Sequence, residues 1–197
     1  VEQNDVLNTF EGLIKYLFKT IKGIDIPELP HIEYADAIKY YGSDKPDLRF
    51  GMKFIEINEL AQKKGFNIFD DSELVVGIVA GGCANYSRKQ LDKLTDFVRK
   101  PQIGAKGLVY VKYNEDGSFK SSVDKFFDQE AFNVWAQKMN AKPGDLMLVL
   151  SGEEDKTRKQ LSELRLEMGN RLELRNPNVF IPLWVVDFPL LEWDEES

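Results

Sequence analysis

The stretch LVVGIVA (Leu74–Ala80) decides the fold. It is apolar at almost every position, whereas a strand with one solvated face alternates apolar and polar residues. We therefore expect a central strand that is covered on both faces and that ends at Gly81 and Gly82. After it, Ser87 and Gln90 have the spacing of a capping box, which predicts the start of a helix.

The regions on both sides of this strand alternate between strand and helix patterns. Apolar residues at helical spacing predict an amphipathic helix over 5–22, which Gly23 ends. Several connections between strands are too short for crossovers, which favours antiparallel pairing. We expect an α+β fold with a mostly antiparallel sheet and helices on one face. The expected strands are 54–57, 74–80, 108–111, 119–123, 146–150 and 183–188, and the expected helices are 5–22, 34–41, 59–63, 87–98, 128–139 and 151–172.

Composition excludes several classes of protein. The chain has 197 residues, of which 43% are apolar and 12% aromatic, and it has one cysteine. Disorder, collagen and a disulfide scaffold are therefore excluded. The net charge of −7 argues against a strongly basic nucleic-acid binder. Lys and Arg equal Asp and Glu at 19 each within 53–173, so the whole negative charge lies in the flanks. This split predicts a self-contained middle domain.

The ends of the chain predict a segment of a longer protein. The sequence begins at Val1 without an initiator methionine or a leader, and it stops just after an apolar strand candidate. No stretch approaches the length of a membrane span. The single thiol, Cys83, suggests a reducing compartment. We therefore expect a cytoplasmic protein with no membrane partner.

The search for catalytic residues predicts none. His31 is the only histidine, so a nucleophile system would have to be built around it, and it lies in an expected strand. Cys83 has no partner cysteine. No spacing resembles a zinc, calcium or P-loop site, so we expect neither a metal site nor a cofactor site. A freestanding enzyme would need a base near His31, and that possibility stays open here.

A loop and two acidic groups have features of ligand sites, but each has a simpler interpretation. The loop 81–87 ends at a helix N-terminus, where backbone N–H groups can receive a phosphate, yet it has no P-loop lysine. We interpret it as a plain strand-to-helix turn. The acidic groups Asp70–Asp71 and Glu153–Asp155 are interpreted as charges at helix starts, which the helix dipole favours. Ser151, just before the second group, and Glu154 within it have the spacing of another capping box.

A basic helix is the candidate nucleic-acid site. Arg88, Lys89 and Lys93 lie on the helix after Ser87, and Arg99 and Lys100 follow at its end. They fit an RNA phosphate contact, and they equally fit a solvated helix surface next to Asp92 and Asp96. Both interpretations stay open.

The run YGSDKPDLR (Tyr41–Arg49) is the most distinctive part of the chain. It combines two carboxylates, an ammonium, a guanidinium and a proline turn. It resembles the corresponding run of bacterial-type aspartyl-tRNA synthetases, and other blocks follow in the order of that family. These blocks are SRKQLD (87–92), GAKGL (104–108), AKPGD (141–145), LRLEMG (164–169) and WVVDFP (184–189).

The resemblance implies a division of the chain. The family carries an insertion called the GAD domain, a two-layer α+β fold of the DCoH-like type, which would occupy 50–173. Residues 1–49 and 174–197 would then be flanks from the class II catalytic core. The segment Lys120–Phe127 departs from the family's usual G-P-I-A-K-F turn, which leaves the role of that loop undefined.

The resemblance also implies the activity of the whole protein. The family uses ATP and Mg²⁺ to form an aspartyl-adenylate, transfers aspartate to the 3′ end of tRNA, and forms homodimers. Its ATP-binding motifs and its dimer-forming motif would lie outside these residues, so we expect this segment alone to be inactive. The alternative is a non-catalytic module that docks tRNA or protein, as in the B subunit of the tRNA-dependent amidotransferase, which shares the GAD domain.

Overall fold

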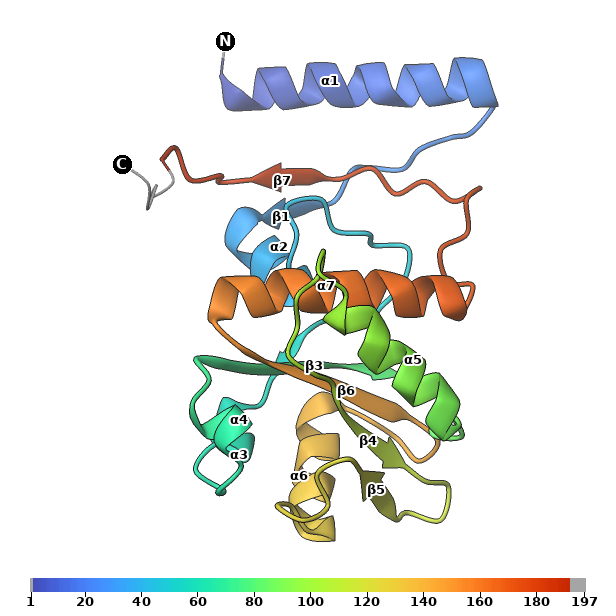
Figure 1. Ribbon diagram of the computed structural model, residues 1–197. Coiled ribbons are helices and arrows are strands. Elements are labelled where there is room, and N and C mark those ends of the chain that lie inside the picture. Colours follow the sequence, from blue (N-terminus) through green and yellow to red (C-terminus); the bar gives the residue numbers. More distant parts are fainter. Residues whose placement is uncertain (1, 192–197) are drawn as a thin grey trace.

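The computed structural model describes residues 2–191, so the end of the expected C-terminal flank, 192–197, lies outside the described residues. Figure 1 shows helices and strands alternating along the chain, as the sequence patterns predict. The elements are α1 (Gln3–Leu17), the π-helix η1 (Phe18–Lys22), β1 (His31–Glu33), α2 (Tyr34–Tyr41), β2 (Ile55–Glu56), α3 (Asn58–Ala61), α4 (Asn67–Asp70), β3 (Leu74–Ala80), α5 (Arg88–Arg99), β4 (Val109–Tyr113), β5 (Phe119–Ser121), α6 (Gln129–Met139), β6 (Leu146–Gly152), α7 (Glu154–Arg171) and β7 (Trp184–Val186).

The main sheet has five antiparallel strands in the order β2-β3-β6-β4-β5. The apolar stretch Leu74–Ala80 is β3, and it pairs with β6 along its whole length, from Leu74 opposite Gly152 to Ala80 opposite Leu146. β4 pairs with the other edge of β6, up to Val109 opposite Val149. The expected central strand, the α+β class and the antiparallel sheet are therefore confirmed.

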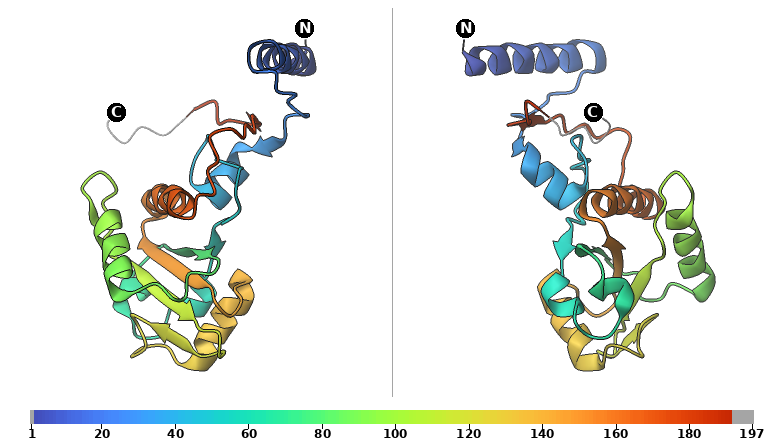
Figure 2. Two further views of the ribbon diagram at one scale, coloured as in Figure 1. Left: turned by 90° about the vertical axis from the view of Figure 1, so that its right-hand side faces the viewer. Right: turned by 60° about the vertical axis from the view of Figure 1, so that its left-hand side comes forward.

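Helices cover both faces of this sheet, so the expected two-layer arrangement with helices on one face is wrong. On one face, alternate β3 residues such as Val76 and Ile78 form a core with α5 and α7. On the other face, Val75 forms a second core with α3, α4 and α6, centred on Trp135. Figure 2 shows these two helix layers with the sheet between them. The reason is that β3 and β6 are apolar at successive positions, so both faces need cover.

A second, two-stranded sheet lies beside the first. β1 and β7 are parallel, with His31 opposite Trp184 and Glu33 opposite Val186. Parallel strands need a crossover connection, and here that connection contains α2, the whole five-stranded sheet and α7. The chain thus leaves one strand pair, builds a complete layered unit and returns to the same pair. The boundaries at 50 and 173 stay predictions.

The N-terminal helix lies at the edge of the molecule (Figure 1), where its Glu11 carboxylate accepts the Leu29 N–H at 3.3 Å. The expected helix over 5–22 is confirmed as α1 followed by η1, and Gly23 ends it with φ 67°. No residue of α1 is buried, and apolar side chains such as Phe10 and Leu13 are 52% and 46% exposed. Within residues 2–191, no helix combines the length and the apolar character needed to cross a bilayer.

Candidate functional site

The candidate nucleic-acid residues Arg88, Lys89 and Lys93 lie on the solvent side of α5 and are exposed. The helix begins as predicted, because the Ser87 hydroxyl accepts the Gln90 N–H at 3.3 Å and the Gln90 side chain accepts the Ser87 N–H at 2.9 Å. Its opposite face is buried through Leu91, Leu94 and Val98. Packing of this buried face therefore fixes the direction in which the three cations point.

The charged side chains in the first turn of α5 have the sign that the helix dipole disfavours. The N-terminal end of a helix is positive, and acidic side chains in the first turn stabilise it. The first turn of α5 has no acidic residue and instead has Arg88 and Lys89. The nearest compensation is a long ion pair, 3.9 Å, between Arg88 and Asp92, both of which are mostly exposed. This end of α5 therefore concentrates positive charge at a place that folding does not favour.

The structure separates the two candidate nucleophile partners. His31 lies at the start of β1 and is exposed, in an open hollow of about 470 Å³ together with Glu11, Lys15 and Glu28. Cys83 is buried after β3, and its thiol donates to the Gly81 carbonyl at 3.4 Å. Burial raises the pKa of the Cys83 thiol, so the thiolate is disfavoured. Within residues 2–191, the hollow that contains His31 is not lined by Cys83.

The loop 81–87 uses its backbone N–H groups internally. The Gly82 N–H donates to the Asp145 carboxylate at 3.0 Å, and the Ala84 N–H donates to the Gly144 carbonyl at 2.9 Å. An incoming phosphate would have to displace these bonds and would lie beside the negative charge of Asp145. This geometry supports the interpretation as a strand-to-helix turn.

The acidic groups differ from one another. Glu154 and Asp155 lie in the first turn of α7, as expected. The N-cap residue is Glu153, so the capping box predicted for Ser151 and Glu154 is wrong, because Ser151 is still part of β6. Asp70 is the last residue of the four-residue α4 and so lies in its single turn, and it accepts the Gly65 N–H at 2.9 Å. Among residues 2–191, no group of three His, Cys, Asp or Glu side chains is placed to hold a metal ion.

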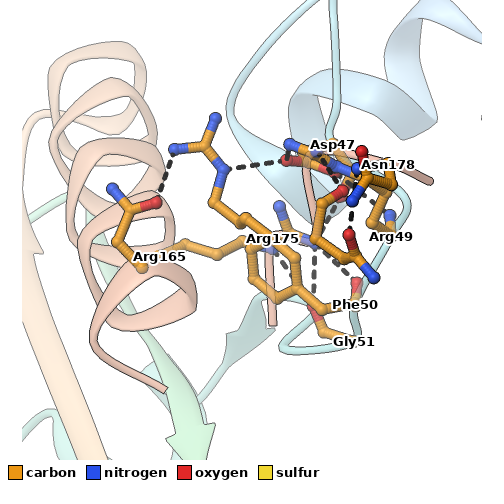
Figure 3. Close-up of polar contacts among 9 residues, drawn as sticks. Asp47, Arg49, Phe50, Gly51, Arg165, Arg175 and Asn178 are labelled. Carbon is orange, nitrogen blue, oxygen red and sulfur yellow. Dashed lines mark hydrogen bonds and ion pairs between the residues drawn. The ribbon is translucent and has the colours of Figure 1, made fainter. Parts of the chain in front are cut away.

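The run 41–49 forms a cluster of charged residues with the chain that follows α7 (Figure 3). The Asp47 carboxylate accepts hydrogen bonds from Arg49 Nε at 2.9 Å, from Arg49 Nη2 at 2.7 Å and from Arg175 Nε at 3.0 Å. Arg49 also donates from Nη1 to the Asn176 carbonyl at 3.0 Å. These bonds lower the pKa of Asp47 well below its usual range, with the Arg49 bonds as the largest cause.

Arg165 completes this cluster from α7. Its guanidinium donates from Nη2 to the backbone carbonyl of Asp47 at 2.8 Å and to that of Phe50 at 2.9 Å. It also stacks on the Phe50 ring, 4.0 Å from the centroid. Only 2% of Arg165 is exposed, and this burial lowers its pKa to about 10, so it stays charged at neutral pH. Sequence reasoning identified the run 41–49 but missed Arg165 and Arg175, which are more than 110 residues away along the chain.

The cluster has the contacts of a structural joint. Asp47 is already saturated by guanidinium donors, and a carboxylate with a lowered pKa is a poor general base. The bonds join the segment that enters the five-stranded sheet to the segment that leaves it. The distinctive run therefore explains how the two parts of the chain are held together.

Comparison with known proteins finds one matching family model and several similar enzymes. The family model described as the GAD domain matches residues 68–161, which include β3, β4, β5, β6, α5 and α6. The whole chain is 58% identical to an aspartate–tRNA ligase of Flavobacterium psychrophilum, of which it covers 34%. It is 58% identical over 199 residues to the aspartate–tRNA ligase of Bacteroides thetaiotaomicron, again covering 34%. Over 194 residues it is 59% identical to that of Azobacteroides pseudotrichonymphae, covering 33%.

The chain thus spans about a third of the length of these relatives. The aligned region covers the whole chain, so it includes the GAD match and both flanks. We conclude that the chain contains a GAD domain and is homologous, over its whole length, to the GAD-containing part of bacterial aspartate–tRNA ligases.

Proposed function

We propose that the chain is the GAD-containing portion of an aspartate–tRNA ligase, in which 50–173 is the insertion and 1–49 and 174–197 belong to the class II core. The observation that carries this proposal is the 58% identity over the whole chain to enzymes of that name. The whole enzyme would use ATP and Mg²⁺ to activate aspartate, transfer it to tRNA, act as a homodimer and reside in the cytoplasm. An amidotransferase subunit is the weaker alternative, because the relatives named above are ligases.

We assign the chemistry to the rest of the protein. Residues 2–191 offer no three-residue metal site, and the N–H groups of Gly82 and Ala84 are engaged within the protein. Among the same residues, Cys83 does not line the hollow that contains His31. We therefore assign no step of adenylate formation to residues 2–191.

Aspartate-dependent pyrophosphate exchange tests this assignment. The full-length protein, made with the gene sequence on both sides of this segment, should exchange pyrophosphate, and residues 1–197 alone should not. Exchange by residues 1–197 would overturn the assignment, and absence of exchange by the full-length protein would overturn the proposed function.

We further propose that Arg88, Lys89 and Lys93 contact phosphates of tRNA. The concentration of positive charge at the N-terminal end of α5, where the helix dipole disfavours it, supports this role. Replacing all three by alanine in the full-length protein should weaken tRNA binding and reduce the salt dependence of log Kd by about one per lost contact.

A matched variant separates this role from a general loss of charge. Lys63, Lys64 and Lys138 are also exposed; the first two lie between α3 and α4, and the third lies on α6. Their triple alanine variant removes the same charge and should leave the tRNA affinity and its salt dependence unchanged. Equal effects of the two triple variants would show that α5 is only a solvated surface.

A further inference from the structure

An apolar hollow of about 300 Å³ lies at the end of the main sheet where β4 begins. We call it the β4 hollow. Its walls are the aromatic rings of Phe66 and Phe126 and the aliphatic side chains of Ile68, Val109, Val123 and Val149. The two rings touch, with centroids 4.8 Å apart. Ile68 and Phe126 are 57% and 45% exposed, so large apolar groups stand open to solvent at its mouth.

The β4 hollow brings together two sequence segments that the proposed catalysis does not use. The GAKGL block supplies Lys106, Gly107 and Leu108. The loop that departs from the usual family turn, 120–127, supplies Ser122, Val123 and Phe126. Neither the cluster around Asp47 nor the outer face of α5 explains why these two segments form one concave apolar surface.

The charged side chains of the hollow's own lining have one sign, whereas the carboxylates of Asp71, Glu73 and Glu153 line an adjoining hollow that shares Lys106. Among the residues that line it, Arg99 and Lys106 are charged and none is a carboxylate. Arg99 donates from Nε to the Lys106 carbonyl at 3.2 Å, which holds the guanidinium beside Lys106. A ligand that fills the hollow would therefore meet two cations at its rim, and anionic groups next to its apolar part would complement them.

Each hydroxyl group in the wall already makes one hydrogen bond within the protein, which leaves few polar partners for a ligand. The Ser122 hydroxyl accepts the Tyr110 N–H at 3.3 Å, the Ser151 hydroxyl donates to the Ile68 carbonyl at 3.3 Å, and the Thr95 hydroxyl donates to the Leu91 carbonyl at 3.0 Å. A nucleic-acid base would bring polar edge atoms into this wall without partners, which is costly. A hydrocarbon side chain needs no such partners.

We propose that the β4 hollow docks a peptide segment that places one large apolar side chain between Phe66, Phe126 and the valines, with Asp or Glu residues on either side facing Arg99 and Lys106. The volume is at the lower end of the range for ligand pockets and suits a single anchoring side chain. This inference is independent of the proposed ligase activity, because it concerns a surface of the GAD domain alone.

The test is titration of the ¹⁵N-labelled chain with the capped peptide acetyl-Asp-Glu-Phe-Glu-Asp-amide, followed by amide NMR signals. Saturable shifts are expected at Ile68, Lys106, Gly107 and Val123, which line the hollow. Replacing the peptide's Phe by Ala should weaken binding about ten-fold or more, because the buried apolar side chain is lost. Absence of a saturable shift, or equal affinity for the Ala peptide, would overturn the proposal.

Variants of the chain test the same contacts from the other side. Phe126→Ala should weaken binding of the Phe peptide, and Arg99→Gln and Lys106→Gln should each weaken it about two- to five-fold. Lys138→Gln is the matched control, since Lys138 is an exposed lysine on α6 outside the hollow, and it should change nothing. The spectrum away from the hollow reports that each variant is folded.

A competing probe distinguishes a peptide from RNA. Pentauridylate carries bases and phosphates but no hydrocarbon anchor. We expect it to leave the signals of the hollow unshifted. Tighter binding of pentauridylate than of the acidic peptide at these amides would overturn the proposal in favour of a single-stranded RNA site.

Discussion

Gly42 lies against the backbone of Arg158: a Cβ atom at Gly42 would come within 2.2 Å of the Arg158 carbonyl oxygen. Gly42 ends α2 with φ 66°, a left-handed conformation that only glycine adopts at little cost. Gly42→Ala therefore combines backbone strain with a clash against α7. We expect it to lower the free energy of unfolding by at least about 2 kcal/mol, measured by urea denaturation.

Gly117→Ala is the matched control for this variant. Gly117 also has a positive φ, 85°, but a Cβ there meets no atom within 4 Å. It should show the backbone cost alone, about 1 kcal/mol. Equal losses from the two variants would mean that the close approach of α2 to α7 contributes nothing.

Asp47→Asn tests the charged cluster. An amide keeps the shape of the side chain but loses the charge that Arg49 and Arg175 face, so we expect a loss of about 1 to 3 kcal/mol at pH 7. Asp44→Asn, in the same run, removes only an exposed pair with Lys45 at 3.7 Å and should change stability by less than about 0.5 kcal/mol. A larger effect at Asp44 than at Asp47 would contradict the assignment.

The contribution of Asp47 should depend on pH in one direction. Its pKa is lower in the folded state than its ordinary value of 3.8, so the unfolded state takes up the proton first on acidification. The stability difference between the native protein and Asp47→Asn is therefore fully present above about pH 5 and shrinks as the pH falls below about 4. Urea denaturation at several pH values measures it, and a difference that grows in acid would refute the lowered pKa.

Arg165→Lys should be strongly destabilising although it keeps the charge. One ammonium cannot replace a planar group that bonds the carbonyls of Asp47, Phe50 and Gly51 and stacks on an aromatic ring. We expect a loss of about 2 to 4 kcal/mol in unfolding free energy. Lys159→Arg, at an exposed position on the same helix, is the control and should have no measurable effect.

A pair of leucine variants tests how far the apolar side of α1 is covered by the rest of the chain. Leu13 is 46% exposed, whereas Leu94 is fully buried between α5 and the sheet. Leu94→Ala should cost about 2 to 5 kcal/mol, and Leu13→Ala less than about 1 kcal/mol. A large thermal destabilisation by Leu13→Ala would show that the apolar side of α1 is covered when residues 1–197 are in solution.

The sequence predicted those parts of the structure that depend on neighbouring residues. The apolar run of β3, the capping box at Ser87 and the cap at Asp128, whose carboxylate accepts the Ala131 N–H at 2.8 Å, are local patterns, and each is present as expected. The number of helix layers was missed because it depends on where α6 packs. Only the continuous apolar run of β3, which does not alternate with polar residues, pointed to two covered faces.

The cluster around Asp47 shows where such reasoning ends. The run 41–49 was distinctive, but its partners Arg165 and Arg175 come from a segment more than 110 residues later. Nothing in the spacing of single residues encodes a contact over that distance. The β4 hollow was missed for the same reason, since its walls come from segments between residues 66 and 151.

The pairing of β1 with β7, together with the bond from Arg49 to the Asn176 carbonyl, places the entry and the exit of the intervening unit side by side. Because its two ends lie side by side, the intervening unit can be exchanged as a whole. A short turn joining residue 48 to residue 176 could replace everything between them without pulling the two strands apart, and a foreign domain with adjacent termini could be grafted at the same place. Evolution could add, lose or remodel such an appendage while the scaffold that carries it kept its geometry.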